Sequence, residues 1–214
     1  MKDIIVLVAD KNMEFAVKGI LQRTVSLKIR EISYDVKVHS HRDPGVYNTA
    51  HDFLRIFLNK YSYALVMLDK EGCGCNDDSK QIAMNIQSRL DSSGWKNCSK
   101  VIVLDPELEI WVWSDSPEVS ACIGWNDTEL RSWLRSEGYM LPNAYKPQNP
   151  KLAFEKALRV KRKPRSSSIY GKLAERVSFE RCIDSAFKEF KGTLQQWFPV
   201  FLADAGLYDE TKKE

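Results

Sequence analysis

Three unbroken apolar segments, each ending in an aspartate, constrain the fold of this chain most strongly. They are IIVLVAD (residues 4–10), ALVMLD (64–69) and KVIVLD (100–105). None of them alternates between apolar and polar residues, so each is expected to form a strand that is covered on both faces. Residues 30–40 do alternate, which predicts a half-exposed strand at a sheet edge.

Helical patterns separate these strands. Apolar residues recur at helical spacing over residues 13–21, 50–60 and 77–91. Asn12 is the expected cap of the first helix, and residues 41–48, which contain Asp43-Pro44-Gly45, are expected to be a loop. Strands that alternate with helices predict an α/β fold with a mostly parallel sheet flanked by helices.

Strand signals become scarce after about residue 124. Helical patterns follow over residues 128–137, 151–162, 170–177 and 179–202. We therefore expect an α/β core over residues 1–124 and a helical C-terminal extension over residues 125–214 that packs on the core.

Composition excludes several classes of protein. The 214 residues are 43% hydrophobic and 29% charged, with a formal net charge of +3, which is typical of a globular chain and indicates no particular partner. No apolar stretch approaches the roughly 20 residues of a membrane-spanning helix. The start, Met1-Lys2-Asp3, is too short and too acidic for a secretory signal. The five cysteines, an odd number at irregular spacing, are expected to be reduced thiols in the cytoplasm.

The acids at the strand ends are the candidate functional residues. Asp10, Asp69 and Asp105 end the apolar segments, and Glu14, Glu71, Glu107 and Glu109 follow closely. Because parallel strands point their carboxyl ends the same way, these acids are expected to meet in one crevice. Crowded carboxylates favour a bound divalent cation or a retained proton, and oxygen-only ligands favour magnesium, manganese or calcium. Solvated turn residues are the alternative.

Several segments resemble the Toprim-like domains of a family found beside bacterial phage-defence genes. They are ADKNME (9–14), LDKEG (68–72), DPELEIWVWSD (105–115) and the tail over residues 166–199. The chain as a whole resembles the small Toprim-like component of a methylation-associated anti-phage defence system. The resemblance covers most of the chain, and it implies a cytoplasmic protein that works with other subunits of such a system.

The resemblance also implies a set of site residues. Asp10 and Glu14 stand at the positions of the two catalytic glutamates of the family. Asp69 and Glu71 take the places of its DxD motif, and Glu109 takes the place of its late acid. The implied chemistry is cleavage of nucleic-acid phosphodiesters, with Mg²⁺ or Mn²⁺ held by Asp69, Glu71 and Glu109.

Departures from the family pattern keep two alternatives open. Aspartate replaces glutamate at position 10, Lys11 replaces a glycine, and Lys70 lies inside the DxD motif, where it could pair with a neighbouring acid. These changes suit a catalytically inactive Toprim-like scaffold that binds a partner. A receiver-like phosphoacceptor domain with Asp69 as acceptor is a further alternative, although no strand ends in the Lys-Pro expected of it.

Cations concentrate between residues 151 and 172. The residues expected to contact DNA or RNA are Lys161, Arg162, Lys163, Arg165 and Lys172. Cations and the hydroxyls of the adjacent serines suit phosphate contacts. A solvated helix end is the alternative, because cations favour helix C-termini.

Cys73, Cys75, His39 and His41 lack the spacing of a zinc site. We expect the two cysteines to lie in a reduced surface loop and both histidines to be solvated.

Overall fold

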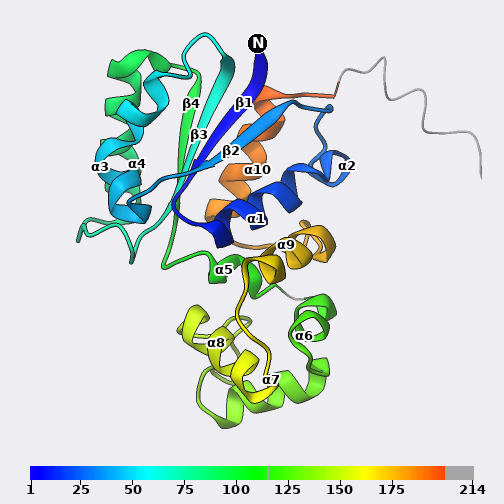
Figure 1. The fold of residues 1–214 in the computed structure, drawn as a ribbon. Helices are drawn as coiled ribbons and strands as arrows, with labels where there is room; N and C mark the ends of the chain where they lie inside the picture. Colours follow the sequence, from blue (N-terminus) through cyan, green and yellow to red (C-terminus); the bar gives the residue numbers. More distant parts are fainter. Residues whose placement is uncertain (115, 201–214) are drawn as a thin grey trace, which may run out of the picture.

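The structure, a computed structural model, describes residues 1–114 and 116–200 (Figure 1). The strands are β1 (Lys2–Val8), β2 (Tyr34–Val38), β3 (Tyr61–Asp69) and β4 (Ser99–Leu104). The helices of the core are α1 (Lys11–Leu21), α2 (Thr24–Leu27), α3 (Arg42–Arg55), α4 (Ser79–Leu90), the π-helical turn η1 (Asp91–Trp95) and α5 (Glu109–Val112). Those of the extension are α6 (Pro117–Ile123), α7 (Asp127–Ser136), α8 (Pro150–Val160), α9 (Ser167–Arg176) and α10 (Ser185–Trp197).

The four strands form one parallel sheet in the order β2-β1-β3-β4, which confirms the predicted α/β class. Helices α3 and α4 cover one face, and α1 and α10 cover the other (Figure 1). The unbroken apolar segments are therefore buried on both sides, whereas the alternating β2 lies at an edge. Val8 of β1 pairs with Val38 and Met67, and Asp69 of β3 pairs with Leu104, so the four strands end close to one level.

The strand order places a crevice beside β1 and β3. The chain runs outward from β1 to β2, then returns and continues outward through β3 and β4. Loops on the two sides of this reversal diverge, and ligands of open α/β sheets bind in the gap that this leaves at the carboxyl ends. Asp10 and Asp69 follow the two strands concerned.

Two local predictions are wrong. Helix α3 begins at Arg42, within the predicted loop, because proline in a first helical turn removes no helical hydrogen bond. Gly45 of that turn lies against His39, and a Cβ there would come within 2.2 Å of the imidazole Nδ1. Helix α1 is capped by Asp10 and not by Asn12: Asp10 Oδ1 accepts a hydrogen bond from the Met13 N–H at 2.9 Å.

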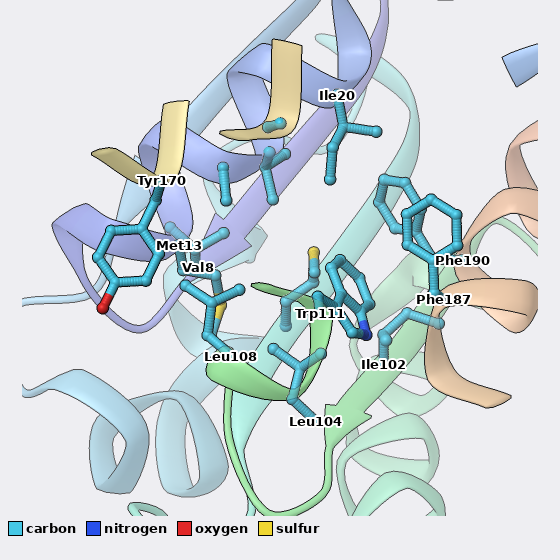
Figure 2. Close-up of a cluster of buried hydrophobic side chains, with 14 of the residues drawn as sticks. Val8, Met13, Ile20, Ile102, Leu104, Leu108, Trp111, Tyr170, Phe187 and Phe190 are labelled. Carbon is cyan, nitrogen blue, oxygen red and sulfur yellow. The ribbon is translucent and has the colours of Figure 1, made fainter. Parts of the chain in front are cut away.

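Leu108 and Trp111 anchor the segment that follows β4. Their side chains are 3% and 8% exposed and enter the apolar layer between the sheet and helices α1, α9 and α10 (Figure 2). The Trp111 indole N–H donates to Asp184 at 2.9 Å, which attaches α10 to this segment. Glu107 and Glu109, on either side of Leu108, are thereby held at the carboxyl end of the sheet.

Helix α9 of the extension lies against α1 of the core. The contact is close because Gly19 faces Gly171 and Ala174: a Cβ on Gly19 would come within 2.9 Å of the Gly171 carbonyl oxygen. The Arg23 guanidinium donates to the carbonyl of Ala174 at 2.8 Å. Helix α6, which we group with the extension, begins at Pro117, within residues 1–124 that the sequence assigns to the core.

Replacement of Gly19 by valine should destabilise the protein. The added side chain meets backbone, which cannot move aside, so we expect a loss of about 1–3 kcal/mol in the free energy of unfolding. Urea unfolding measures it. Gly192→Ala on α10 is the matched control, because nothing lies within 4 Å of its Cβ position. Equal stabilities of the two variants would contradict this account of the interface between α1 and α9.

Candidate functional site

A cleft of about 760 Å³ lies at the carboxyl end of the sheet. It is lined by the loops that follow all four strands and by two residues of the extension. We call it the acidic cleft; its charged lining residues are Asp10, Lys11, Arg42, Asp43, Asp69, Glu71, Glu107, Glu109, Lys151 and Arg165. The acids predicted at positions 10, 69, 71 and 109 therefore lie in one cleft.

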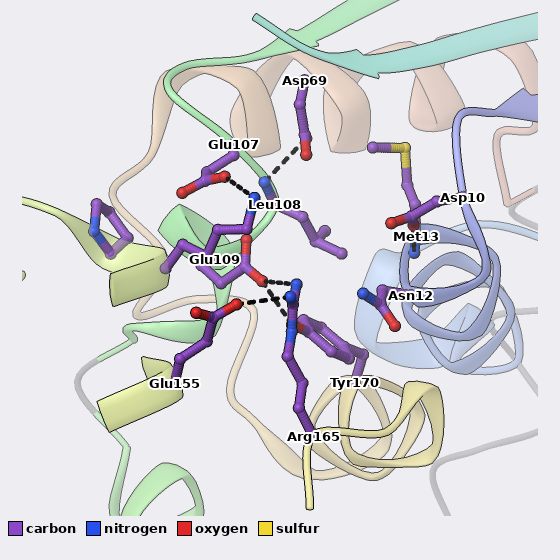
Figure 3. Close-up of polar contacts among 12 residues, drawn as sticks. Asp10, Asn12, Met13, Asp69, Glu107, Leu108, Glu109, Glu155, Arg165 and Tyr170 are labelled. Carbon is purple, nitrogen blue, oxygen red and sulfur yellow. Dashed lines mark hydrogen bonds and ion pairs between the residues drawn. The ribbon is translucent and has the colours of Figure 1, made fainter. Parts of the chain in front are cut away.

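Asp69, at the end of β3, lines the acidic cleft and is mostly buried. Figure 3 shows its carboxylate directed toward Leu108. Its Oδ1 accepts a hydrogen bond from the Leu108 N–H at 2.9 Å. Burial raises the pKa of this carboxyl well above its ordinary value, and the neighbouring carboxylates of Asp43, Glu109, Asp10 and Glu107 raise it further. No cation of the described chain forms an ion pair with it.

Asp43, in the first turn of α3, is a cleft residue that the sequence analysis missed. Its Oδ1 accepts a hydrogen bond from the Asp69 N–H at 2.7 Å. Its Oδ2 lies only 2.6 Å from the position that a Cβ on Gly72 would occupy. The glycine of LDKEG therefore makes room for this carboxylate. Burial, and then the charge of Asp10, raise the pKa of Asp43. Its only sequence signal was an aspartate before Pro-Gly, which also marks an ordinary turn.

Asp10 faces the acidic cleft from the first turn beyond β1. One of its oxygens caps α1, and the other accepts no hydrogen bond from the described residues. Glu14 does not line the cleft. Its carboxylate lies between Lys11 and Lys18, with a 2.6 Å contact to each ammonium group. Burial raises the pKa of Glu14, but the two ammonium groups outweigh burial and lower it. Of the two predicted catalytic residues, only Asp10 therefore lines the acidic cleft.

The extension supplies the two cations that pair with the glutamates after β4. Lys151, in the first turn of α8, contacts Glu107 at 2.7 Å. Arg165, before α9, contacts Glu109 Oε1 at 2.7 Å, and the Tyr170 hydroxyl donates to the same oxygen at 2.5 Å (Figure 3). Burial raises the pKa of Glu107, and Lys151 only partly offsets this. Burial and the charge of Glu109 raise the pKa of Tyr170, so its hydroxyl stays protonated and donating.

Two other strand-end acids are placed differently. Glu71 is exposed at the rim of the acidic cleft, and its backbone N–H donates to the Pro106 carbonyl at 3.1 Å. Asp105 does not line the cleft, so the expectation that all three strand-end aspartates meet there is wrong. Its side chain accepts a hydrogen bond from Ser79 at the start of α4 and another from Lys70 at 3.0 Å. Lys70 is thus held away from the cleft.

His39 and Cys73 are buried, which corrects their predicted exposure. His39 Nδ1 accepts a hydrogen bond from the His41 N–H at 3.1 Å. The Thr49 hydroxyl donates to the Gly45 carbonyl, so His39 Nε2–H donates to Thr49 Oγ1 at 3.1 Å. Burial also lowers the pKa of His39. The ring is therefore neutral with both nitrogens in use, and it is no free base. All five cysteines are free thiols.

The predicted nucleic-acid-binding residues do not all line one hollow. Arg162, Lys163 and Arg165 line a second hollow beside the acidic cleft. Lys161 and Lys172 line neither hollow. Lys161 lies over the Trp125 ring, 4.3 Å from its centroid.

The donor set of the acidic cleft suits a hard divalent cation, because the carboxylates of Asp10, Asp43 and Asp69 have no cation partner in the described chain and offer only oxygen ligands. Within residues 1–114 and 116–200, no three His, Cys, Asp or Glu side chains stand close enough together to hold a metal ion. Coordination by Asp43, Asp69 and Asp10 would therefore require their side chains to move.

Comparison of the chain with protein-family models, curated proteins and solved structures finds no match. The family resemblance thus rests on the sequence motifs alone. Across residues 1–114 and 116–200, no helix has both the length and the apolar character needed to cross a membrane.

Replacement of Asp69 by asparagine should stabilise the cation-free protein at neutral pH. An acid whose pKa is raised by folding stabilises the fold below its ordinary pKa of 3.8, and this contribution is lost as the pH rises through the raised value. Asparagine keeps an oxygen for the Leu108 N–H and removes the charge. We expect the gain to vanish as the pH falls toward 3.8.

Urea unfolding in chelator between about pH 8 and about pH 4 measures this difference. Asp105→Asn is the matched control, and its effect on the free energy of unfolding at neutral pH should have the opposite sign. Hydrogen bonds from Ser79 and Lys70 outweigh burial and lower the pKa of Asp105, so its contribution is present at neutral pH and is lost as the pH falls. A destabilised Asp69→Asn at neutral pH would contradict the charge balance described for the cleft.

Proposed function

We propose that the acidic cleft binds Mg²⁺ or Mn²⁺ and that the protein cleaves nucleic-acid phosphodiesters. One observation carries this proposal: Asp10, Asp43 and Asp69 face one cleft without a cation partner in the described chain. They come from three adjacent parallel strands, at the end of the strand or in the segment that follows it. Burial of carboxylates without compensation costs free energy, and a divalent cation would remove that cost.

The biological setting that we propose rests on the sequence resemblance. In it, the protein is a component of a bacterial anti-phage defence system, acts in the cytoplasm and binds other subunits of that system. DNA or RNA is its substrate.

Asp43 and Asp69 would hold the cation, with Asp10 beside them. When bound, the cation would neutralise phosphate charge and lower the pKa of a water molecule. Asp10 is the candidate base, because the oxygen that does not cap α1 is free to accept a proton. Glu14 is left out of this mechanism, since two lysines occupy its carboxylate.

Lys151 and Arg165 have a separate role in this proposal. By pairing with Glu107 and Glu109, they neutralise these two carboxylates of the acidic cleft. A phosphate can then approach a bound cation without meeting two further uncompensated carboxylates. Arg165 would also donate to a phosphate oxygen, because this residue lines the cleft.

A catalytically inactive scaffold is the second candidate, and the same ion pairs favour it. Glu109, one of the predicted metal ligands, is only 2% exposed, and its Oε1 is already occupied by Arg165 and Tyr170. An inactive subunit would bind nucleic acid or a partner without cleaving it.

Titration with Mg²⁺ and Mn²⁺ should raise the Tm of the protein. At about 100 times Kd the expected rise is roughly 5–10 °C for a chain of this length. Asp69→Asn and Asp43→Asn should each abolish most of the rise, and Asp105→Asn should retain it because Asp105 lies outside the cleft. The same variants are then assayed for cation-dependent cleavage of labelled DNA and RNA.

A flat Tm response of the wild-type protein would refute the cation site. A cation response without cleavage of any of these substrates would favour the scaffold over the nuclease.

A further inference from the structure

A hollow of about 730 Å³ adjoins the acidic cleft and carries the opposite charge. We call it the basic groove; it is lined by Glu155, Lys156, Leu158, Arg159, Arg162, Lys163, Pro164 and Arg165. Five of these eight residues are cations and one is an acid. Arg165 lines both the basic groove and the acidic cleft, so the two hollows adjoin at this residue.

We propose that the basic groove binds the phosphodiester backbone of the nucleic-acid strand whose scissile bond lies in the acidic cleft. This inference rests on the proposed function and narrows its substrate to a strand long enough to reach both hollows.

The chain builds the basic groove by reversing direction at the end of α8. The Arg162 N–H donates to the Arg159 carbonyl at 3.0 Å, and the Lys163 N–H donates to the Leu158 carbonyl at 2.9 Å. This pair of bonds is the Schellman motif, in which the turning residue is left-handed and is usually glycine. Here it is Arg162, with φ of 53°. The reversal brings Lys163 and Arg165 alongside α8, where they line one hollow with Arg159.

An arginine at this position is costly to the fold. A side chain in the left-handed region crowds its own backbone, and glycine would avoid that strain. The charge of Arg162 also adds to the repulsion among the neighbouring cations. Both costs are explained if the guanidinium contacts a ligand.

The cations of the basic groove are largely available to a ligand. Lys156, Arg159 and Arg162 have no side-chain partner within the described chain. Within the described chain, the ammonium group of Lys163 donates one hydrogen bond, to the Cys122 carbonyl at 3.1 Å. Arg165 contacts Glu155 at 2.7 Å, a contact that a phosphate could replace.

The chemistry of the lining indicates a phosphate backbone recognised without regard to sequence. Guanidinium groups form paired hydrogen bonds with phosphate oxygens, and a row of them suits a repeating anion. None of the residues that line the groove is aromatic, so the groove offers no surface on which bases could stack. We therefore expect salt-dependent binding that tolerates any base sequence.

Fluorescence anisotropy with labelled mixed-sequence oligonucleotides in chelator tests the proposal. Asp69→Asn serves as the parent, so that cleavage cannot interfere and binding is read without a cation. Adding Arg159→Ala and Arg162→Ala should weaken binding and reduce the slope of log Kd against log salt concentration by roughly 1.4–1.8. Lys60→Ala with Lys96→Ala is the matched control, because these exposed lysines flank the opposite, amino ends of β3 and β4.

Arg162→Gly separates binding from folding. It removes the same charge as the alanine variant and relieves the left-handed strain, so we expect weaker oligonucleotide binding together with a Tm about 2 °C higher. A loss of binding cannot then be attributed to unfolding. Arg162→Lys, which keeps the charge, should retain most of the affinity.

Equal affinity and equal salt dependence of the groove variant and its control would overturn the proposal. The proposal would also be overturned if polyglutamate or anionic lipid vesicles bound as tightly as the oligonucleotides and lost as much affinity when Arg159 and Arg162 are replaced. The groove would then be a surface for another class of partner. Neither result would affect the test of the cation site in the acidic cleft, because that site is tested independently by the Tm response to Mg²⁺ and Mn²⁺.

Discussion

Uncompensated charge on the Asp69 carboxylate is the constraint on which the rest of the site depends. The group ends a central strand, is mostly buried and has carboxylates around it, so burial and repulsion both oppose its ionisation. Stability alone does not explain such a residue, because an amide of the same size would avoid the cost. The surrounding structure keeps this carboxylate in place: the Leu108 N–H binds it, and Asp43 binds its backbone N–H.

The helical extension completes this charge arrangement. Lys151 and Arg165 neutralise Glu107 and Glu109, which Leu108 holds at the carboxyl end of the sheet through its place in the apolar core. The aspartates of the first three strand ends receive no such partner within the described chain. The extension thus divides the acids into a neutralised pair of glutamates and a set of aspartates without a cation partner in the described chain. This division would be lost if α9 did not lie against α1, because Arg165 immediately precedes α9.

The sequence predicts the fold and part of the site, for physical reasons that differ between residues. Unbroken apolar segments separated by helical patterns allow only a covered parallel sheet, and parallel strands bring Asp10 and Asp69 to one edge. Asp43 was missed because Pro-Gly marks both a turn and a first helical turn, and only the packing of Gly45 on His39 distinguishes them. Asp105 was wrongly placed because sequence does not fix which side of a sheet a residue beyond the strand will face.

The charge distribution also bears on what kind of substrate could use both hollows. A small phosphorylated molecule bound to a cation in the acidic cleft would need only the aspartates and Arg165. It would leave Lys156, Arg159 and Arg162 repelling one another with no ligand between them. A strand with a phosphate at every residue can place one phosphate at the aspartates and others along the basic groove. Arg165 lies between the two charge environments, so it can exchange Glu155 for a phosphate while it continues to hold Glu109.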